Sequence, residues 1–130
     1  MYTVARSLVV IVVSVMSVGC SMTVSAEKVY GTYIASYPFA TETITLNRDG
    51  TFVQRVAIKQ DQPVTVRGTW DFDPKESRVS LYGAMLLVDG FDHLRGDWRT
   101  VTTGIVSWDV ERHWFRVVMH SASAYPYVKQ

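Results

Sequence analysis

The nine residues VTVRGTWDF, at positions 64–72, alternate strictly between apolar and polar side chains. Successive side chains of a β-strand point to opposite faces, so this alternation predicts a strand with one buried and one solvated face. Val66 and Trp70 are predicted to face the core, and Arg67 and Thr69 to face water. A half-buried strand of this kind is typical of an antiparallel sheet.

Strand signals recur immediately upstream. Residues 43–46 alternate in the same way, and a further strand is marked by Phe52 and Val56. The four residues NRDG at 47–50 lie between them and predict a hairpin turn, because Gly50 can adopt a positive φ without steric cost.

The rest of the chain repeats this pattern of short strands and turns. No segment of ten or more residues has the 3.6-residue period of a helix. We therefore predict an all-β domain, an antiparallel up-and-down meander of about eight strands that forms a small barrel, with a sandwich as the alternative. Further strands are predicted at residues 29–37, 78–88, 100–110, 113–120 and 125–128, and turns at 61–63, 73–77 and 109–112.

The N-terminal residues have the composition of an export signal. Arg6 is the only charged residue before Glu27, and residues 8–18, LVVIVVSVMSV, are almost wholly apolar. This run is shorter than the roughly 20 residues that a membrane-spanning helix needs, and it fits the apolar region of a signal peptide. We predict an apolar signal helix over residues 1–19, a tether over 20–28 and the β domain over 29–130.

Two cleavage sites follow the apolar run. The sequence SVGC at 17–20 resembles the lipobox of bacterial lipoproteins, with Ser17 where that family usually has an aliphatic residue. The resemblance implies that Cys20 is lipidated, and Ser21 after it is similar to the pattern for outer-membrane sorting. The alternatives are cleavage after Ala26, which would release a soluble periplasmic or secreted protein, and an uncleaved signal anchor.

Charge and cysteine content exclude several classes of protein. The chain has 13 basic and 12 acidic residues, and loss of residues 1–19 removes only Arg6, which leaves 12 of each. This balance gives no support for a nucleic-acid-binding protein. A neutral domain is weakly attracted to anionic headgroups, so the lipid is predicted to provide the anchoring. The single cysteine excludes an internal disulfide.

Three short motifs occur in a suggestive order: GTY at 31–33, TITLNRDGTF at 43–52 and GTW at 68–70. In this order they resemble the lipocalin-like β-meander domains of many bacterial lipoproteins and secreted proteins. The motifs describe hairpin geometry, with a glycine at a crowded strand position, a DG turn and a core tryptophan. The resemblance implies binding of a small apolar ligand in the barrel or of a partner protein, and it implies no catalytic residues.

Residues that carry chemistry are few. There is no GxSxG motif, and Asp71 and Asp73 are interpreted as turn residues beside Pro74. The segment DGFDHLRGD at 89–97 contains three aspartates and a histidine, at a spacing that matches no calcium loop, and it is interpreted as a polar loop. We predict no catalytic residue and no cofactor.

The histidines are also interpreted as structural. His113 and His120 are seven residues apart on one predicted strand, so their side chains would face opposite sides of the sheet. They could bind one metal ion together only if this strand assignment were wrong. With His93 in the polar loop, we predict no metal site.

Aromatic residues are the remaining binding candidates. Trp114 and Phe115 are adjacent, so in a strand one of them would face away from the core and be available for contact. With Trp70 and Trp108 they form our set of candidate binding residues. We predict a non-enzymatic lipoprotein, palmitoylated at Cys20 and anchored in the outer membrane facing the periplasm, that holds a small apolar ligand or an envelope protein. The alternative is a soluble inhibitor or chaperone-like module.

Overall fold

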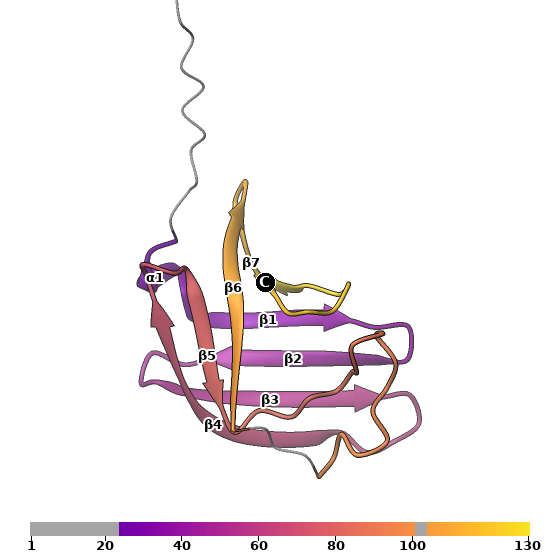
Figure 1. Ribbon diagram of the computed structural model, residues 1–130. Helices are drawn as coiled ribbons and strands as arrows, with labels where there is room; N and C mark the ends of the chain where they lie inside the picture. Colours follow the sequence, from indigo (N-terminus) through magenta and orange to yellow (C-terminus); the bar gives the residue numbers. More distant parts are fainter. Residues whose placement is uncertain (1–23, 101–103) are drawn as a thin grey trace, which may run out of the picture.

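The computed structural model describes residues 24–100 and 104–130 and forms a closed antiparallel β-barrel (Figure 1). The strands follow one another around the barrel in sequence order, and the first pairs with the last. This confirms the predicted up-and-down meander and decides for the barrel over the sandwich. The elements are α1 (Ala26–Val29), β1 (Gly31–Ser36), β2 (Ala40–Leu46), β3 (Thr51–Ile58), β4 (Val64–Asp73), β5 (Arg78–Tyr82), β6 (Ile105–His113), β7 (Arg116–His120) and β8 (Tyr127–Lys129).

Strand β4 has the two faces that its sequence predicts. Half-buried and exposed residues alternate along its whole length. Val66 and Trp70 pack against the core, whereas Arg67 and Thr69 are exposed. In the neighbouring strand β3, Phe52 is fully buried.

The turn between β2 and β3 has the predicted geometry. Gly50 adopts a φ of 83°, a conformation that favours glycine. Asp49 Oδ1 accepts hydrogen bonds from the backbone N–H of Thr51 at 2.9 Å and from its hydroxyl at 2.6 Å. The indole N–H of Trp70 donates to the carbonyl oxygen of Asn47 at 2.8 Å, which ties the turn to β4.

The two ends of the barrel are covered differently. At one end lies α1, where the buried residues Val24 and Val29 belong to the core and the hydroxyl of Tyr33 donates to the carbonyl oxygen of Val29. The opposite end is covered by the long β5–β6 connection, which contributes buried residues such as Met85 and Trp98. No helix among the described residues is long and apolar enough to cross a membrane.

The predicted strand at 78–88 is too long. Strand β5 ends at Tyr82, because the next residue, Gly83, adopts a φ of 89° and turns the chain out of the sheet. The segment that follows is apolar because it covers the end of the barrel, with Ala84, Met85 and Leu87 all buried. An apolar run therefore indicated burial here, and the prediction of strand structure was wrong.

The predicted turn at 109–112 is also wrong. Strand β6 continues to His113, and its hairpin turn to β7 consists of Trp114 and Phe115. Asp109 and Glu111 lie on the exposed face of β6, while Val110 faces the core and Arg112 is half-buried. The turn lacks the residues that usually mark a hairpin, and Trp114 itself adopts a positive φ of 56°. The hairpin projects beyond the rest of the barrel (Figure 1).

Candidate functional site

A carboxyl group is buried inside the barrel. Glu42 is 1% exposed, and its Oε2 atom accepts hydrogen bonds from the hydroxyls of Tyr127 at 2.8 Å and Tyr37 at 3.1 Å. Its Oε1 atom accepts a hydrogen bond from Nε2 of Gln54 at 2.6 Å. These four side chains come from β2, β3, β8 and the segment after β1, and we call them the Glu42 cluster.

Gln54 connects this cluster to the connection that covers the barrel end. Its Nε2 atom also donates to the carbonyl oxygen of Met85 at 3.0 Å, and its Oε1 atom accepts from the backbone N–H of Met85 at 2.7 Å. Within the described part of the chain, no buried side-chain nitrogen or oxygen lacks a hydrogen-bond partner. The cluster therefore fixes the position of the β5–β6 connection relative to the strands.

Burial controls the protonation of these groups. It raises the pKa of Glu42 above its ordinary value, although the hydrogen bonds from Tyr127, Gln54 and Tyr37 act in the opposite direction. The pKa values of Tyr37 and Tyr127 are also raised, first by burial and then by the nearby Glu42 carboxyl. Glu42 therefore keeps its proton to a higher pH than an exposed glutamate does.

Sequence reasoning missed the Glu42 cluster, although a local signal was present. The alternation of β2 places Glu42 on the same face as Ile44, and that of β3 places Gln54 on the same face as Phe52. Gln54 pairs with Ile44 across the two strands, so Glu42 and Gln54 are diagonal neighbours on the inner face. The local signal was therefore that each strand has a polar residue, Glu42 or Gln54, at a position where the alternation predicts a core residue.

A cavity of about 330 Å³ lies next to the cluster, under the β5–β6 connection. The ring of Trp108 stacks on the ring of Tyr127, with centroids 4.5 Å apart and planes inclined by 18°. Tyr37 and Tyr127 contribute to the wall while their hydroxyls bond to Glu42, so the cluster holds part of the cavity wall in place. The lining residues are Tyr37, Met85, Leu86, Leu87, Val88, Asp89, Gly90, Arg95, Val106, Ser107, Trp108, Ser121, Ala122, Ser123 and Tyr127.

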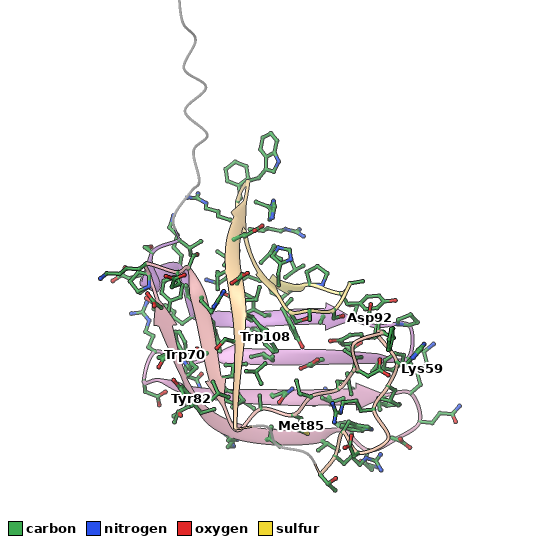
Figure 2. The ribbon with its side chains drawn as sticks, in the orientation of Figure 1. Lys59, Trp70, Tyr82, Met85, Asp92 and Trp108 are labelled. Carbon is green, nitrogen blue, oxygen red and sulfur yellow. The ribbon has the colours of Figure 1, made fainter. Side chains whose placement is uncertain are left out.

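The structure separates the four aromatic residues that the sequence proposed for binding. Only Trp108 lines this cavity. Trp70 lies toward the α1 end of the barrel, away from Met85 (Figure 2). Trp114 and Phe115 are 85% and 91% exposed at the tip of the β6–β7 hairpin, so both face solvent rather than one of them. The predicted lipidation site, Cys20, lies outside the described residues.

The aspartates of the 89–97 loop are engaged by neighbouring residues of the protein. Asp89 Oδ1 accepts hydrogen bonds from the backbone N–H groups of Phe91 and His93, which lower the pKa of Asp89. Asp92 accepts from the backbone N–H of Ala124, and Asp97 pairs with a neighbouring arginine. The loop geometry agrees with the interpretation as a polar connection.

The predicted turn residues Asp71 and Asp73 have separate partners. Asp71 accepts a hydrogen bond from the hydroxyl of Tyr82 at 2.9 Å, and Asp73 accepts from the backbone N–H of Lys75 at 2.9 Å. Both carboxylates are exposed. Each carboxylate is therefore engaged by a different donor.

The histidine prediction rested on the wrong strand boundary. Because the hairpin turn lies between His113 and His120, these residues occupy adjacent strands and lie on the same outer face. Glu111 lies beside them. These three residues are the one group among the described parts of the chain whose ligand atoms are close enough to hold a metal ion.

A basic groove lies at the α1 end of the barrel. It has a volume of about 590 Å³, and its charged lining residues, Lys28, Arg112, Arg116 and Lys129, are all cationic. Phe115 also lines this groove, which places the exposed hairpin tip beside the end at which the described chain begins.

Comparison with known proteins adds no assignment. No family model matches the sequence, and neither the curated proteins nor the solved structures give a significant match to the chain.

Proposed function

We propose that this protein is a lipid-anchored protein of the cell envelope whose barrel binds a small ligand with an apolar body. The observation that carries the proposal is the cavity beside the Glu42 cluster. Its volume of about 330 Å³ lies at the lower end of the range for small-molecule sites, about 300–1,000 Å³. Binding without catalysis is the role that we propose for this cavity.

The chemistry of the cavity wall defines the class of ligand. Trp108, Tyr127 and Leu87 provide flat and aliphatic surface that favours an apolar body. Ser123 adds a hydroxyl that can orient a polar end group. Because the tyrosine hydroxyls are held by Glu42, this wall is ordered before a ligand arrives, which lowers the entropic cost of binding.

A photoreactive alkyl alcohol carrying a diazirine tests the ligand site. We expect its adducts on peptides that contain Tyr37, Trp108 or Tyr127, because these side chains line the cavity. Ala122→Trp, which introduces a large side chain into the lining, should reduce labelling by about tenfold, the effect of losing about 1.4 kcal/mol of binding free energy. Adducts are mapped by peptide mass spectrometry after irradiation of the full-length protein.

The matched control is Ala124→Trp, in the same loop but outside the cavity lining. It should label like the unmodified protein. Equal labelling of both variants, or adducts spread over the outer face of the barrel, would remove the ligand site from the proposal.

Three features support attachment to a membrane at the α1 end. The described chain begins there, the basic groove with Arg112 and Arg116 lies there, and Trp114 and Phe115 project from the adjacent hairpin. Exposed aromatics favour the membrane interface, and cations favour anionic headgroups. Although the domain is neutral overall, its charges are distributed unevenly, so this end would face the leaflet while the cavity faces away from it.

Metabolic labelling with an alkyne analogue of palmitate tests the anchor. We expect incorporation into the wild-type protein and its complete loss in Cys20→Ala, because the chain has one cysteine. Ser21→Ala, the control, should keep the label. Unchanged labelling of Cys20→Ala would contradict an anchor at Cys20. A mature protein whose intact mass shows that it begins at Glu27 would favour the alternative of a soluble inhibitor or chaperone-like module. The exposed Trp114 and Phe115 would then serve a protein contact.

A further inference from the structure

The β6–β7 hairpin gathers two imidazoles and one carboxylate on the outer face of the barrel. Glu111 and His113 are two residues apart on β6 and therefore share a face. His120 on β7 pairs with Asp109, which makes it a diagonal neighbour of Glu111 across the two strands. One ligand atom from each of Glu111, His113 and His120 lies within 4.8 Å of the others.

The distances between these atoms approach those of a coordination shell. Oε2 of Glu111 lies 2.9 Å from Nε2 of His113 and 3.3 Å from Nε2 of His120. Ligand atoms bound tetrahedrally to zinc, at about 2.0–2.1 Å from the ion, are separated by about 3.3–3.4 Å. The two rings meet edge to face, with centroids 6.0 Å apart and planes inclined by 76°. Small side-chain rotations would suffice to place an ion between the three atoms.

We propose that Glu111, His113 and His120 form a binding site for a divalent transition metal ion of the zinc class. Two nitrogen ligands and one oxygen ligand suit Zn²⁺, Ni²⁺ or Cu²⁺, whereas Ca²⁺ and Mg²⁺ prefer shells of oxygen. Each imidazole would bind through Nε2 and keep its proton on Nδ1. A three-ligand site leaves a fourth position for water or an external ligand.

Other charged side chains lie close to this site. Arg116 pairs with His113 across the hairpin and places a cation nearby, while Asp109, opposite His120, is engaged by Arg78 at 3.0 Å. The side chains of Glu111, His113 and His120 are 57%, 59% and 41% exposed, so water screens these charges and an ion can enter freely. The site lies outside the ligand cavity and is independent of the proposed function.

Titration of the untagged full-length protein with zinc chloride, followed by isothermal calorimetry, tests the site. We expect saturable binding of one ion per chain, with proton release that is revealed by comparing two buffers of different ionisation enthalpy. His113→Ala and His120→Ala should each weaken binding at least about tenfold, because even losing the partner of a ligand costs 10- to 100-fold. Glu111→Gln should weaken it as well, since the amide is a poorer ligand than the carboxylate.

The chain provides a matched control in its third histidine. His93 is exposed and pairs with Asp89 in the loop at the opposite end of the barrel, so His93→Ala should bind zinc like the wild type. All four variants alter exposed side chains, and circular dichroism will show whether each remains folded. Absence of saturable binding by the wild type, or an equal loss in His93→Ala, would overturn the proposal.

Discussion

Replacement of Gly68 by alanine is expected to lower the free energy of unfolding by about 3 kcal/mol, the upper part of the usual range for overpacking a core. A Cβ atom at this position would lie 2.1 Å from the carbonyl oxygen of Tyr82 and 2.6 Å from a ring carbon of Phe52. Tyr82 pairs with Thr69 in the β4–β5 ladder, so its carbonyl cannot withdraw without disturbing that ladder. Phe52 is fully buried and has little room to move.

The matched control is Gly96→Ala in the β5–β6 connection. No heavy atom lies within 4 Å of a Cβ atom built there, so the change should stay within about 0.5 kcal/mol. Both variants can be compared with the wild type by urea unfolding followed by far-ultraviolet circular dichroism. Equal stability of Gly68→Ala and Gly96→Ala would show that the crowding at Gly68 is relieved in solution.

Replacement of Glu42 by leucine is expected to cost about 3 kcal/mol, because it removes the shared acceptor of three buried donors and unpaired buried groups cost about 1–3 kcal/mol each. The hydroxyls of Tyr37 and Tyr127 would retain only each other, at 3.4 Å, and Gln54 would retain only Met85. Glu42→Gln keeps the shape and offers both a donor and an acceptor, so its cost should be much smaller. Urea unfolding at constant pH measures both variants. A leucine variant as stable as the glutamine variant would contradict the assigned role of Glu42.

Comparison of the wild type with Glu42→Gln tests how the stability of the protein depends on pH. Burial raises the pKa of Glu42 above its ordinary value of 4.5, so the folded protein holds this proton more tightly than the unfolded chain. The stabilisation of the folded state that comes from this raised pKa is fully present at a pH below the ordinary pKa. It declines by up to about 1.4 kcal/mol per pH unit until the pH passes the raised pKa. Glu42→Gln lacks this dependence. The wild type should therefore lose stability relative to Glu42→Gln as the pH rises from 4 to 8, and parallel curves would contradict the raised pKa.

Much of the fold was predictable because its signals are local. The alternation at 64–72 identified the faces of β4, and the NRDG sequence identified the β2–β3 turn. Predictions failed where the usual local signal was absent, or where the same signal is compatible with two kinds of structure. The hairpin at Trp114 and Phe115 contains no typical turn residue, and the apolar segment after Tyr82 is buried as a cover rather than as a strand.

The candidate sites depended on partners far away in the chain. Tyr127 bonds to Glu42 across 85 positions, and Gln54 bonds to Met85 across 31. The spacing of His113 and His120 excluded a shared site only on the assumption of one continuous strand. A hairpin turn reversed that conclusion by placing them side by side.

The sequence by itself determined that the chain forms short antiparallel strands, since the two-residue period and the turn residues act within a few positions. Only the tertiary structure decided which inward positions meet, where the cavity lies and which outer side chains converge. Those relations depend on strand register and barrel closure, which are set by contacts between residues distant in the chain.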